Sequence, residues 1–517
     1  MREAGMLIHK FETQDKKYIY DAATNRILEV DEVIYELIED YGSLSSEEMI
    51  AKYGSKYDSQ LISKRFAEIE SIRRKQGCFS LSGPDVGFLM TRPAAAQKLE
   101  STCSTMAIEV TEQCNLRCTY CVFSGGYLEG RAHSSRKMSF EIAKEAIDYL
   151  VEHSYQSGDD FLSLNFYGGE PLLNFQLIKK CVNYCESLKT KKPWLFGFTT
   201  NLTILNPEIL KFCIKHGIAI TVSLDGPRTV HDRCRVDSNG KGSFDKVMQN
   251  LEMIRHYDKE YFRTKILFNI VLSLPVNWLQ INDFFTREQG LEGNPLSLSD
   301  VEEGNESYFS QFPEADFGYD GYDELRRKFY EMAIAGKLFS HATKTRMPRK
   351  GTTEEILSSA TGALTFSQFT APLLKMDRRP IFPGWPSHKI GHSGPCLPGD
   401  RKLFVDVRGR LYPCEKVPYN DLFCIGNVKT GMDTDKAYDL IQQFYELSAA
   451  ECSQCWAFRL CGQCMVRASE KNRFSRAKKL ARCGQEKAGL HQRLMLYCSI
   501  LEKRPDALDD RGTVSFS

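Results

Sequence analysis

The middle of the chain alternates between two hydrophobic periods. Short apolar runs rich in aromatic or β-branched residues, such as FLSLNFY and IAITVSL, have the composition of buried strands. Between them lie segments such as SFEIAKEAIDYLVEH, in which apolar positions recur every three to four residues, as in an amphipathic helix. Strand and helix alternate in this way from residue 105 to about 300, and PLSLSDV is a candidate sixth strand. Strands joined by helical crossovers run parallel, so we expect an α/β fold with its chemistry at the carboxyl ends of the strands.

The first part of the chain shows another pattern and predicts a separate small domain. MLIHKFET, KYIYDA and RILEV predict three short strands, and three helices follow, the third over about 58–76. This order resembles a winged helix-turn-helix, a DNA-binding architecture. Residues 1–83 carry 12 Lys and Arg against 15 Asp and Glu, a balance of −3 that argues against phosphate binding. A peptide added along an edge strand, around KYIYDA or RILEV and beside the third helix, fits better.

The length of 517 residues predicts about three domains. We expect a winged-helix-like domain over 1–83, a linker over 84–104, the strand–helix domain over 105–301, a bridging region over 302–395 with helical stretches near 321–338 and 352–361, a cysteine-rich domain over 396–490, and a C-terminal helix end and tail over 491–517.

Charge and composition narrow the expected partners and location. Lys and Arg number 68 and Asp and Glu 67, so the chain lacks the basic footprint of a nucleic-acid binder. No apolar run reaches the roughly 18 residues of a membrane span, and the N-terminus has no signal-peptide core. We therefore expect a cytosolic protein that binds neither nucleic acid nor membrane. In the cytosol, its 18 cysteines indicate metal binding or catalysis rather than disulfides.

The first cysteine group, in CNLRCTYC, follows the predicted strand TMAIEV. Its thiolates, Cys114, Cys118 and Cys121, can hold three irons of a [4Fe–4S] cluster and leave the fourth iron open to another ligand. Zinc is the alternative, and His133 is the nearby residue that could complete its site.

This loop resembles the CxxxCxxC signature of the radical S-adenosylmethionine (radical SAM) enzymes, which follows the first strand of a partial (β/α)6 barrel. Motifs at later strand ends agree with the family in order. The resemblance implies S-adenosylmethionine as cofactor, with contacts from Tyr120, from Gly168, Gly169 and Glu170 of GGEP, from Asn201 of TTN, from Ser223 and Asp225 of SLDGP, and from Arg235. Each motif alone could instead be a turn, a helix cap or an ordinary ion pair.

The second cysteine group begins with Cys396 and Cys414, which flank the predicted hairpin KLFVDVRGRLYP. It continues with Cys452, Cys455, Cys461 and Cys464, separated by two, five and two residues, and ends with Cys483. Five residues between the CxxC pairs are too few for an ordinary zinc ribbon. The spacing resembles the SPASM domain that extends some radical SAM enzymes, although that domain has three residues where this chain has two between Cys461 and Cys464.

That resemblance implies two auxiliary [4Fe–4S] clusters, for three in total. The distal one would be held by Cys452, Cys455, Cys461 and Cys483, and the nearer one by Cys396, Cys414 and Cys464. Either Cys424 or a thiolate of the substrate would complete the nearer cluster; Cys424 could equally be a packing residue. Glu415 is either a catalytic base, by analogy with an acid of the sulfatase-maturing branch, or a glutamate paired with Lys416.

Together these parts resemble the maturases of ribosomally made Cys-rich peptides. The resemblance implies that a 5′-deoxyadenosyl radical abstracts hydrogen from a carbon of the precursor peptide, leading to a thioether between a cysteine sulfur and that carbon. The leader of the peptide would bind the N-terminal domain, and a flavodoxin or ferredoxin would supply electrons. Other peptide crosslinks, formylglycine formation in a sulfatase, and a noncatalytic peptide-binding scaffold are the alternatives.

Overall fold

The computed structural model describes residues 6–509 except 128–130, 288–290, 292, 303–305, 314–318 and 339–362. The chain divides into two compact units. Unit 1 comprises Met1–Thr91, Leu373–Cys396 and Asp439–Asp506, and unit 2 comprises Arg92–Pro372, Leu397–Tyr438 and Ala507–Ser517. The expected helix over 352–361 lies outside the described residues.

Unit 2 is built on an eight-stranded sheet with the order β10-β8-β7-β6-β5-β4-β12-β13. Its strands are β4 Thr105–Thr111, β5 Leu162–Gly168, β6 Trp194–Thr200, β7 Ala219–Ser223, β8 Ile266–Leu272, β10 Leu296–Asp300, β12 Lys402–Val405 and β13 Leu411–Tyr412. The first six run parallel to their neighbours, and β12 adds parallel to β4. The expected sixth strand and the expected β12–β13 hairpin are both confirmed.

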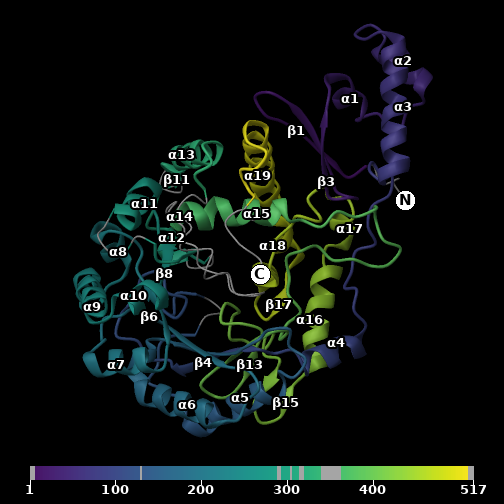
Figure 1. Ribbon diagram of the computed structural model, residues 1–517. Helices are drawn as coiled ribbons and strands as arrows, with labels where there is room; N and C mark the ends of the chain where they lie inside the picture. The colour runs from purple at the N-terminus through teal and green to yellow at the C-terminus, as the bar shows by residue number, and fades with distance from the viewer. Residues whose placement is uncertain are drawn as a thin grey trace. The chain divides into compact units, whose positions relative to one another are not determined.

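Helices connect these strands and line the outside of the curved sheet (Figure 1). They are α4 Arg92–Leu99, α5 Phe140–Glu152, η1 Pro171–Asn174, α6 Phe175–Ser187, α7 Pro207–Lys215, α8 Arg228–Cys234, α9 Phe244–Tyr257, α10 Lys259–Lys265 and α11 Trp278–Arg287. Ser139 caps α5 by accepting a hydrogen bond from the Ile142 amide. The apolar stripe of α5 packs inward through Ala143, Ile147 and Leu150, which explains its helical spacing.

The rest of unit 2 consists of short elements around this sheet. They are β9 Val276–Asn277, α12 Glu306–Phe309, β11 Tyr319–Asp320, α13 Tyr322–Ile334, α14 Ala363–Thr365, η4 Phe366–Thr370, β14 Gly426–Asn427 and β15 Gly431–Met432. Helices α15 Ala371–Asp377 and α16 Thr434–Glu446 carry the chain into unit 1.

The N-terminal part of unit 1 is a three-stranded antiparallel sheet followed by three helices, as the sequence predicts. Its elements are β1 Ile8–Glu12, β2 Lys17–Asp21, β3 Arg26–Val30, α1 Glu32–Leu37, α2 Ser46–Tyr53 and α3 Ser59–Gln76. Ser45 and Glu48 form a capping box at the start of α2. Ile19 of β2, Leu37 of α1 and Ile69 of α3 belong to one buried core.

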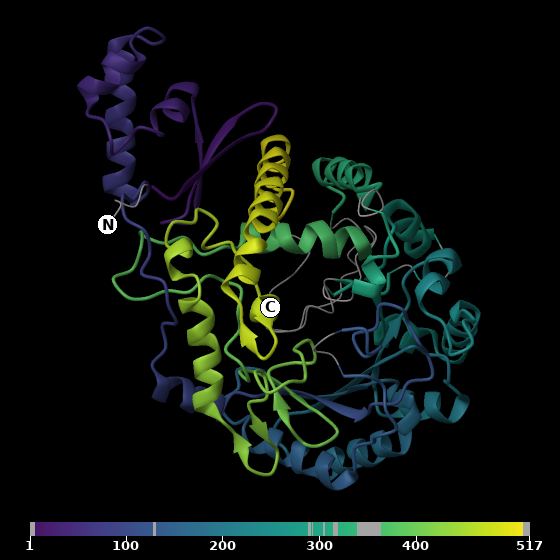
Figure 2. The same cartoon turned by 180° about the vertical axis from the view of Figure 1, so that it is seen from behind.

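The prediction that KYIYDA could be an edge strand is wrong. This segment is β2, the central strand, and its backbone pairs with β1 on one side and β3 on the other. A central strand has no free backbone groups for an added peptide. RILEV, which forms β3, is an edge of the sheet, and so is β1, which lies beside α19 Cys483–Lys503 (Figure 2).

The C-terminal part of unit 1 packs on the N-terminal sheet. It contains α17 Ala449–Cys452, η5 Met465–Ala468, β16 Ser469–Glu470, β17 Arg473–Phe474, α18 Arg476–Ala481 and α19. The Arg459 guanidinium donates hydrogen bonds of 2.8 Å to Ala22 O, 2.9 Å to Ala23 O and 3.1 Å to Gly384 O. Segments far apart in the sequence therefore share one interior. In the described part of the chain, no helix is both long and apolar enough to cross a membrane.

Candidate functional site

The loop after β4 holds the first three cysteines, and two of their sulfurs accept hydrogen bonds from backbone amides. Leu116 N donates to Cys114 Sγ at 3.4 Å, and Phe123 N donates to Cys121 Sγ at 3.4 Å. Burial raises the pKa of Cys114 to about 11 and that of Cys118 to about 12. These thiols are therefore neutral by themselves, and coordination to a metal is what would deprotonate them.

The positions of the side chains indicate whether the loop fits a single metal ion or an iron–sulfur cluster. Within the described residues, no three His, Cys, Asp or Glu side chains converge closely enough for a single metal ion. A [4Fe–4S] cluster binds each thiolate on a different iron, so its cysteines need not share one point. His133 Nε2 lies 4.0 Å from Cys121 Sγ, so His133 is a neighbour of the loop.

Two glycines of GGEP let the end of β5 approach the cysteine loop closely. A Cβ at Gly168, whose φ is +139°, would lie 2.2 Å from Thr111 O, and a Cβ at Gly169 would lie 2.2 Å from Gln113 O. The space allows two hydrogen bonds instead: Gly169 N donates to Thr111 O, and Glu170 N donates to Gln113 O, both at 2.8 Å. The family resemblance implies that these glycines let the cofactor approach the backbone closely. In the structure they lie against the backbone segment that leads into the cysteine loop.

The Glu170 carboxylate ties together the ends of two strands. Its oxygens accept hydrogen bonds from Leu172 N at 3.1 Å, Thr200 Oγ1 at 2.7 Å and Asn201 N at 2.8 Å. Burial raises the pKa of Glu170 to about 7, although these donors oppose the shift. Asn201 in turn donates through Nδ2 to Asn115 Oδ1 at 3.0 Å, inside the cysteine loop. The acid and the amide therefore connect the ends of β5 and β6 to the loop.

Asp225 is the centre of a buried polar group at the end of β7. Arg235 donates to its carboxylate through Nε at 2.9 Å and Nη2 at 3.1 Å, and the Tyr120 hydroxyl also donates to it. Val271 N donates a fourth hydrogen bond at 2.9 Å. Three predicted cofactor residues thus lie together. Burial raises the pKa of Cys118, and the charge of Arg235 opposes that increase, so the cation lies within electrostatic reach of the cluster loop. Ser223 is the last residue of β7 and is buried.

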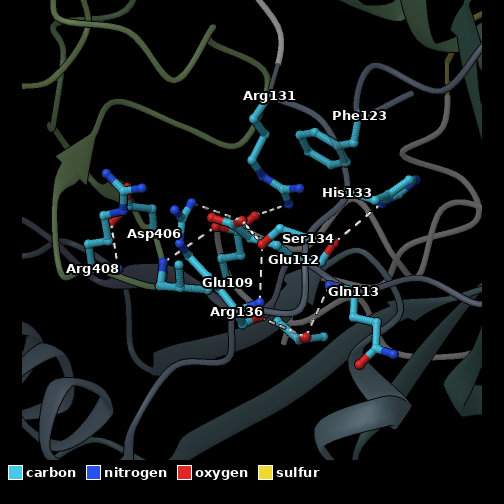
Figure 3. A network of polar contacts seen from close by, with 12 residues as sticks. Glu109, Glu112, Gln113, Phe123, Arg131, His133, Ser134, Arg136, Asp406 and Arg408 are labelled. Atoms are coloured by element: carbon cyan, nitrogen blue, oxygen red, sulfur yellow. Dashed lines mark hydrogen bonds and ion pairs between the residues drawn. The ribbon is translucent and has the colours of Figure 1, made fainter. Parts of the chain in front are cut away.

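A polar cavity of about 300 Å³ opens between β4, the segment around residue 131 and the β12–β13 hairpin (Figure 3). Glu109 of β4 is fully buried there and forms an ion pair with Arg131. Arg131 also stacks over the Phe123 ring at 3.8 Å. Burial raises the pKa of Glu109 to about 7, and Arg131 opposes the shift. Asp406 in the hairpin is likewise paired with an arginine, Arg410, at 2.7 Å.

The sequence did not single out Glu109 or Arg131. An acid within the apolar strand TMAIEVT was the available signal for Glu109, because a buried charge requires a partner. Arg131 gives no such signal, since its pairing depends on the fold of the loop.

Glu415 forms an ion pair with Lys402, whose Nζ donates to Oε1 at 2.8 Å, whereas the sequence pointed to Lys416. Burial raises the pKa of Tyr167, and the charges of Glu415 and Cys121 add to that increase. Tyr167 therefore lies within electrostatic reach of both residues, which places Glu415 in the region of the cysteine loop.

The four cysteines expected to hold the distal cluster all lie in unit 1. Cys452 ends α17, Cys455 and Cys461 follow in the next loop, and Cys483 begins α19. Burial raises the pKa of Cys455, and Cys452 and Cys483 add to the increase; Cys452 and Cys455 act on Cys461 in the same way. The four sulfurs thus form one electrostatically coupled group.

The cysteines expected at the nearer cluster are divided between the units. Cys396 and Cys464 belong to unit 1 and are exposed, whereas Cys414 and Cys424 belong to unit 2 and are half-buried. Cys424 Sγ lies 3.6 Å from Gly426 O. The cysteines outside the motifs are buried, as expected of packing residues: Cys78, Cys103, Cys181, Cys185, Cys213, Cys234 and Cys498.

The N-terminal sheet meets the distal cysteine group through aromatic side chains. His9 of β1 stacks on Trp456, next to Cys455, with ring centroids 3.8 Å apart and planes 9° apart. His9 Nε2 and His491 Nδ1 of α19 share a hydrogen bond of 2.9 Å. Burial, and then His491, lower the pKa of His9 to about 4, so His9 is neutral near pH 7.

Comparison with known proteins accounts for the cysteine loop. Residues 108–286 match the family model described as "Radical SAM superfamily". The chain therefore contains a radical SAM domain, which implies a [4Fe–4S] cluster and S-adenosylmethionine. The loop fits that group, because it offers three thiols, amide donors to two of the sulfurs and no convergence on a single ion.

Several curated proteins are similar over parts of the chain. A cysteine-type anaerobic sulfatase-maturating enzyme of Clostridium novyi is 29% identical over 153 residues, which are 29% of this chain and 40% of that enzyme. The radical SAM cyclopropyl synthase TigE of Paramaledivibacter caminithermalis is 26% identical over 170 residues, 32% of this chain and 34% of that protein. The chain thus spans less than half the length of these two relatives. A longer alignment, at 22% identity, links 67% of this chain with 84% of the cysteine-type sulfatase-maturating enzyme of Clostridium perfringens strain 13.

A solved structure shares the fold. The structure described as native anSMEcpe with bound AdoMet and Cp18Cys peptide has a TM-score of 0.52 and 19% identity, and the match covers 77% of this chain and 99% of that one. The likeness supports the mixed α/β fold with a parallel sheet that the sequence predicts.

Proposed function

We propose that the protein is a peptide maturase that forms a thioether between a cysteine sulfur and a carbon of a ribosomally made Cys-rich precursor peptide. Unit 1 holds the leader of that peptide, and the end of the parallel sheet in unit 2 holds the residues to be joined. A flavodoxin or ferredoxin delivers electrons, and the reaction takes place in the cytosol.

The observation that carries the peptide assignment is the edge strand β3. Among the described strands β3 pairs only with β2, so its outer backbone groups are available to a peptide. Leu28 and Val30 of β3 pack on the same core as Ile62 and Ile69 of α3, which places the strand and the helix on one side of the domain. The net charge of −3 over residues 1–83 favours a peptide over DNA. That a solved structure of similar fold contains a Cys-containing peptide supports the same assignment.

In unit 2, Cys114, Cys118 and Cys121 hold the [4Fe–4S] cluster. When bound with it, S-adenosylmethionine supplies a 5′-deoxyadenosyl radical that removes hydrogen from an unactivated carbon. Gly168, Gly169 and Glu170 keep the loop in place, and Asn201 and Ser223 border the cofactor. Arg235, fixed by Asp225 through Nε and Nη2, still has Nη1 to offer to a carboxylate of the cofactor.

Auxiliary clusters complete the proposed enzyme, for three in total. Cys452, Cys455, Cys461 and Cys483 hold the distal one; Cys396, Cys414 and Cys464 hold the nearer one. Its fourth ligand is a substrate thiolate or Cys424. A thiolate kept on iron would be deprotonated and fixed in direction for attack on the carbon. Cys424→Ala distinguishes the two: retained iron and crosslinking support substrate capture, and loss of an auxiliary cluster assigns Cys424 as ligand.

The test is mass spectrometry of a short Cys-rich peptide encoded beside the gene, after anaerobic reaction with the reconstituted enzyme. A thioether removes two hydrogens, keeps the sulfur and leaves one thiol fewer for alkylation. The enzyme without its cluster cysteines is the control. A peptide that returns unmodified, while S-adenosylmethionine is cleaved, would contradict the assignment.

Formylglycine formation is the second candidate, because the sulfatase-maturating enzyme of Clostridium perfringens strain 13 aligns with 67% of this chain. Conversion of cysteine to formylglycine removes the sulfur, so the same spectra separate the two reactions. Glu415, which forms an ion pair with Lys402, would be the base candidate.

A further inference from the structure

A lysine is buried inside the cysteine-rich part of unit 1 without an acidic partner. Lys479 of α18 is only 2% exposed. Its Nζ donates a 2.5 Å hydrogen bond to Phe444 O and lies 3.6 Å from the centre of the Phe444 ring. No carboxylate within the described residues forms an ion pair with it. A buried charge with one carbonyl and one ring as partners is costly unless an opposite charge lies near.

Lys479 lies beside two of the expected ligands of the distal cluster: Cys483 Sγ donates a 3.9 Å hydrogen bond to Lys479 O. Ser448, four residues after Phe444, shares a 3.3 Å hydrogen bond with Cys452 Sγ through its hydroxyl. Burial lowers the pKa of Lys479 to about 8, and Cys452, Cys461 and Cys483 oppose that shift. The other titratable neighbour, His392, is also buried; burial and then Lys479 lower its pKa to about 4. His392 is therefore neutral and adds no second positive charge beside Lys479.

Neutral thiols would not balance the charge of Lys479. A buried thiol that is not bound to a metal is uncharged at neutral pH. Thiolates on iron are anionic, and a cluster with four of them carries net negative charge. The buried cation thus has a counter-charge only when these cysteines hold a cluster.

We propose that Lys479 is the built-in counter-charge of the distal auxiliary cluster and raises its reduction potential. The proposal rests on the proposed function insofar as that assigns a cluster to Cys452, Cys455, Cys461 and Cys483. Reduction adds one negative charge to the cluster, and a nearby cation in a low-dielectric interior stabilises that reduced state more than the oxidised one. Lys479 touches neither substrate nor cofactor, so it is a positioning residue for electron transfer.

Two other charged residues lie near the same cysteines, and their effect on the cluster must be compared with that of the buried lysine. Lys487 of α19 lowers the pKa of Cys455, and Glu486 raises that of Cys461, in both cases after the larger effect of burial. Both side chains are partly exposed, so solvent screens them. Lys479 is the buried one and should dominate.

The experiment compares Lys479→Met, which keeps the length of the side chain but not its charge, with Lys479→Arg, which keeps the charge. Lys478→Met is the matched control, because Lys478 is the preceding residue of α18 and is exposed. Iron per chain and the midpoint potential of each cluster are measured on the full-length protein by anaerobic redox titration followed by electron paramagnetic resonance. A variant lacking Cys114, Cys118 and Cys121 isolates the auxiliary signals.

We expect Lys479→Met to shift one auxiliary potential to more negative values, Lys479→Arg to restore it at least in part, and Lys478→Met to leave it unchanged. If Lys479→Met loses the iron of the distal cluster and Lys479→Arg retains it, the proposal is supported as well. An unchanged potential in Lys479→Met, or iron loss in both substitutions, overturns it. Wild-type protein with only one cluster would overturn the cluster assignment as well, whereas peptide that stays unmodified beside normal potentials would contradict the proposed reaction alone.

Discussion

The two cysteine regions of this protein prepare for the same metal chemistry in different ways. In unit 2 the loop with Cys114 is held by main chain: glycines at 168 and 169 let the ends of β4 and β5 bond to each other, and the Glu170 carboxylate accepts from the amides of Leu172 and Asn201. The cysteines from 452 to 483 in unit 1 are held by side chains, which include the stacked pair His9 and Trp456.

The charges differ as well. Two buried carboxylates of unit 2 are paired with arginines, Glu109 with Arg131 and Asp225 with Arg235, and Glu170 is held by neutral donors. In unit 1, Lys479 is buried with no acid beside it in the described residues. Protein groups alone balance or bond the buried charges of the first region. In the second region, the charge of the buried lysine is balanced only when the proposed cluster is bound. Unit 2 should therefore tolerate iron removal better than unit 1.

The largest expected effect separates the two sites completely. Replacing Cys114, Cys118 and Cys121 by Ala should abolish formation of 5′-deoxyadenosine and leave about eight irons, because the two auxiliary clusters have their own ligands. Iron analysis and chromatography of the reaction products measure both. Continued cleavage of S-adenosylmethionine by the reconstituted variant would show that this loop is not the reactive site.

The next prediction tests whether main-chain interlock holds the first site. Gly169→Ala places a methyl group 2.2 Å from Gln113 O, so the loop must move, at a cost of about 2 kcal/mol. We expect at least a tenfold loss of 5′-deoxyadenosine formation and normal auxiliary clusters. Gly158→Ala is the control, since a Cβ there meets nothing within 4 Å. Equal activity of the two variants would refute the interlock.

A third prediction addresses the free edge of unit 1. Neighbouring residues of an edge strand point their N–H groups alternately to the paired strand and outward. Of Ile27→Pro and Leu28→Pro, one should therefore weaken leader binding with little change in stability, and the other should destabilise the sheet. Fluorescence anisotropy with a labelled leader and thermal unfolding distinguish them. If neither substitution weakens binding in folded protein, the leader binds elsewhere.

The fourth prediction concerns the paired charges of unit 2. The pKa of Glu109 rises from an ordinary 4.5 to about 7 on folding, so the folded state keeps a proton that the unfolded state loses. Stability should fall as pH rises from 4.5 to 7 and then level off, by on the order of 3 kcal/mol for this group. Glu109→Gln should remove this part of the slope in urea unfolding. The pKa of Glu170 is also raised on folding, so part of the wild-type dependence of stability on pH should remain in Glu109→Gln.

The smallest effect is expected at the side-chain contact of unit 1. His9→Phe keeps a ring on Trp456 but loses the bond to His491, which should cost about 1 kcal/mol near pH 7. The folded pKa of His9 lies below the usual 6.5, so wild-type stability should decline as pH falls from 6.5 toward 4, and the variant should not share that decline. His153→Phe, at a similar stack on Tyr149 in unit 2, is the control for thermal unfolding.

Local patterns were enough to predict most elements of both units. The sixth strand in PLSLSDV and the hairpin around residue 409 both form as expected. Caps such as Ser139 mark helix starts because their side chains satisfy nearby amides. Motif order alone located the cysteine loop and its neighbours Glu170 and Asn201, which the structure brings together.

Long-range pairing was beyond the sequence. Nothing in RILEV or KYIYDA tells which strand is central, because both have strand periodicity and the order depends on the turns. The partner of Glu415 lies across a hairpin, at Lys402 rather than at its sequence neighbour. Lys479 looks like any helical lysine in RAKKLARCG, and only the fold shows that its side chain is buried.

Unit 1 joins the two ends of the polypeptide, since residues up to 91 share an interior with residues 439–506. During synthesis, the first 90 residues therefore leave the ribosome long before Arg459, which bonds the turn at Ala22 and Ala23. Contacts of such sequence separation form late. We therefore expect the N-terminal sheet of unit 1 to complete its packing only after residues 439–506 have been synthesised.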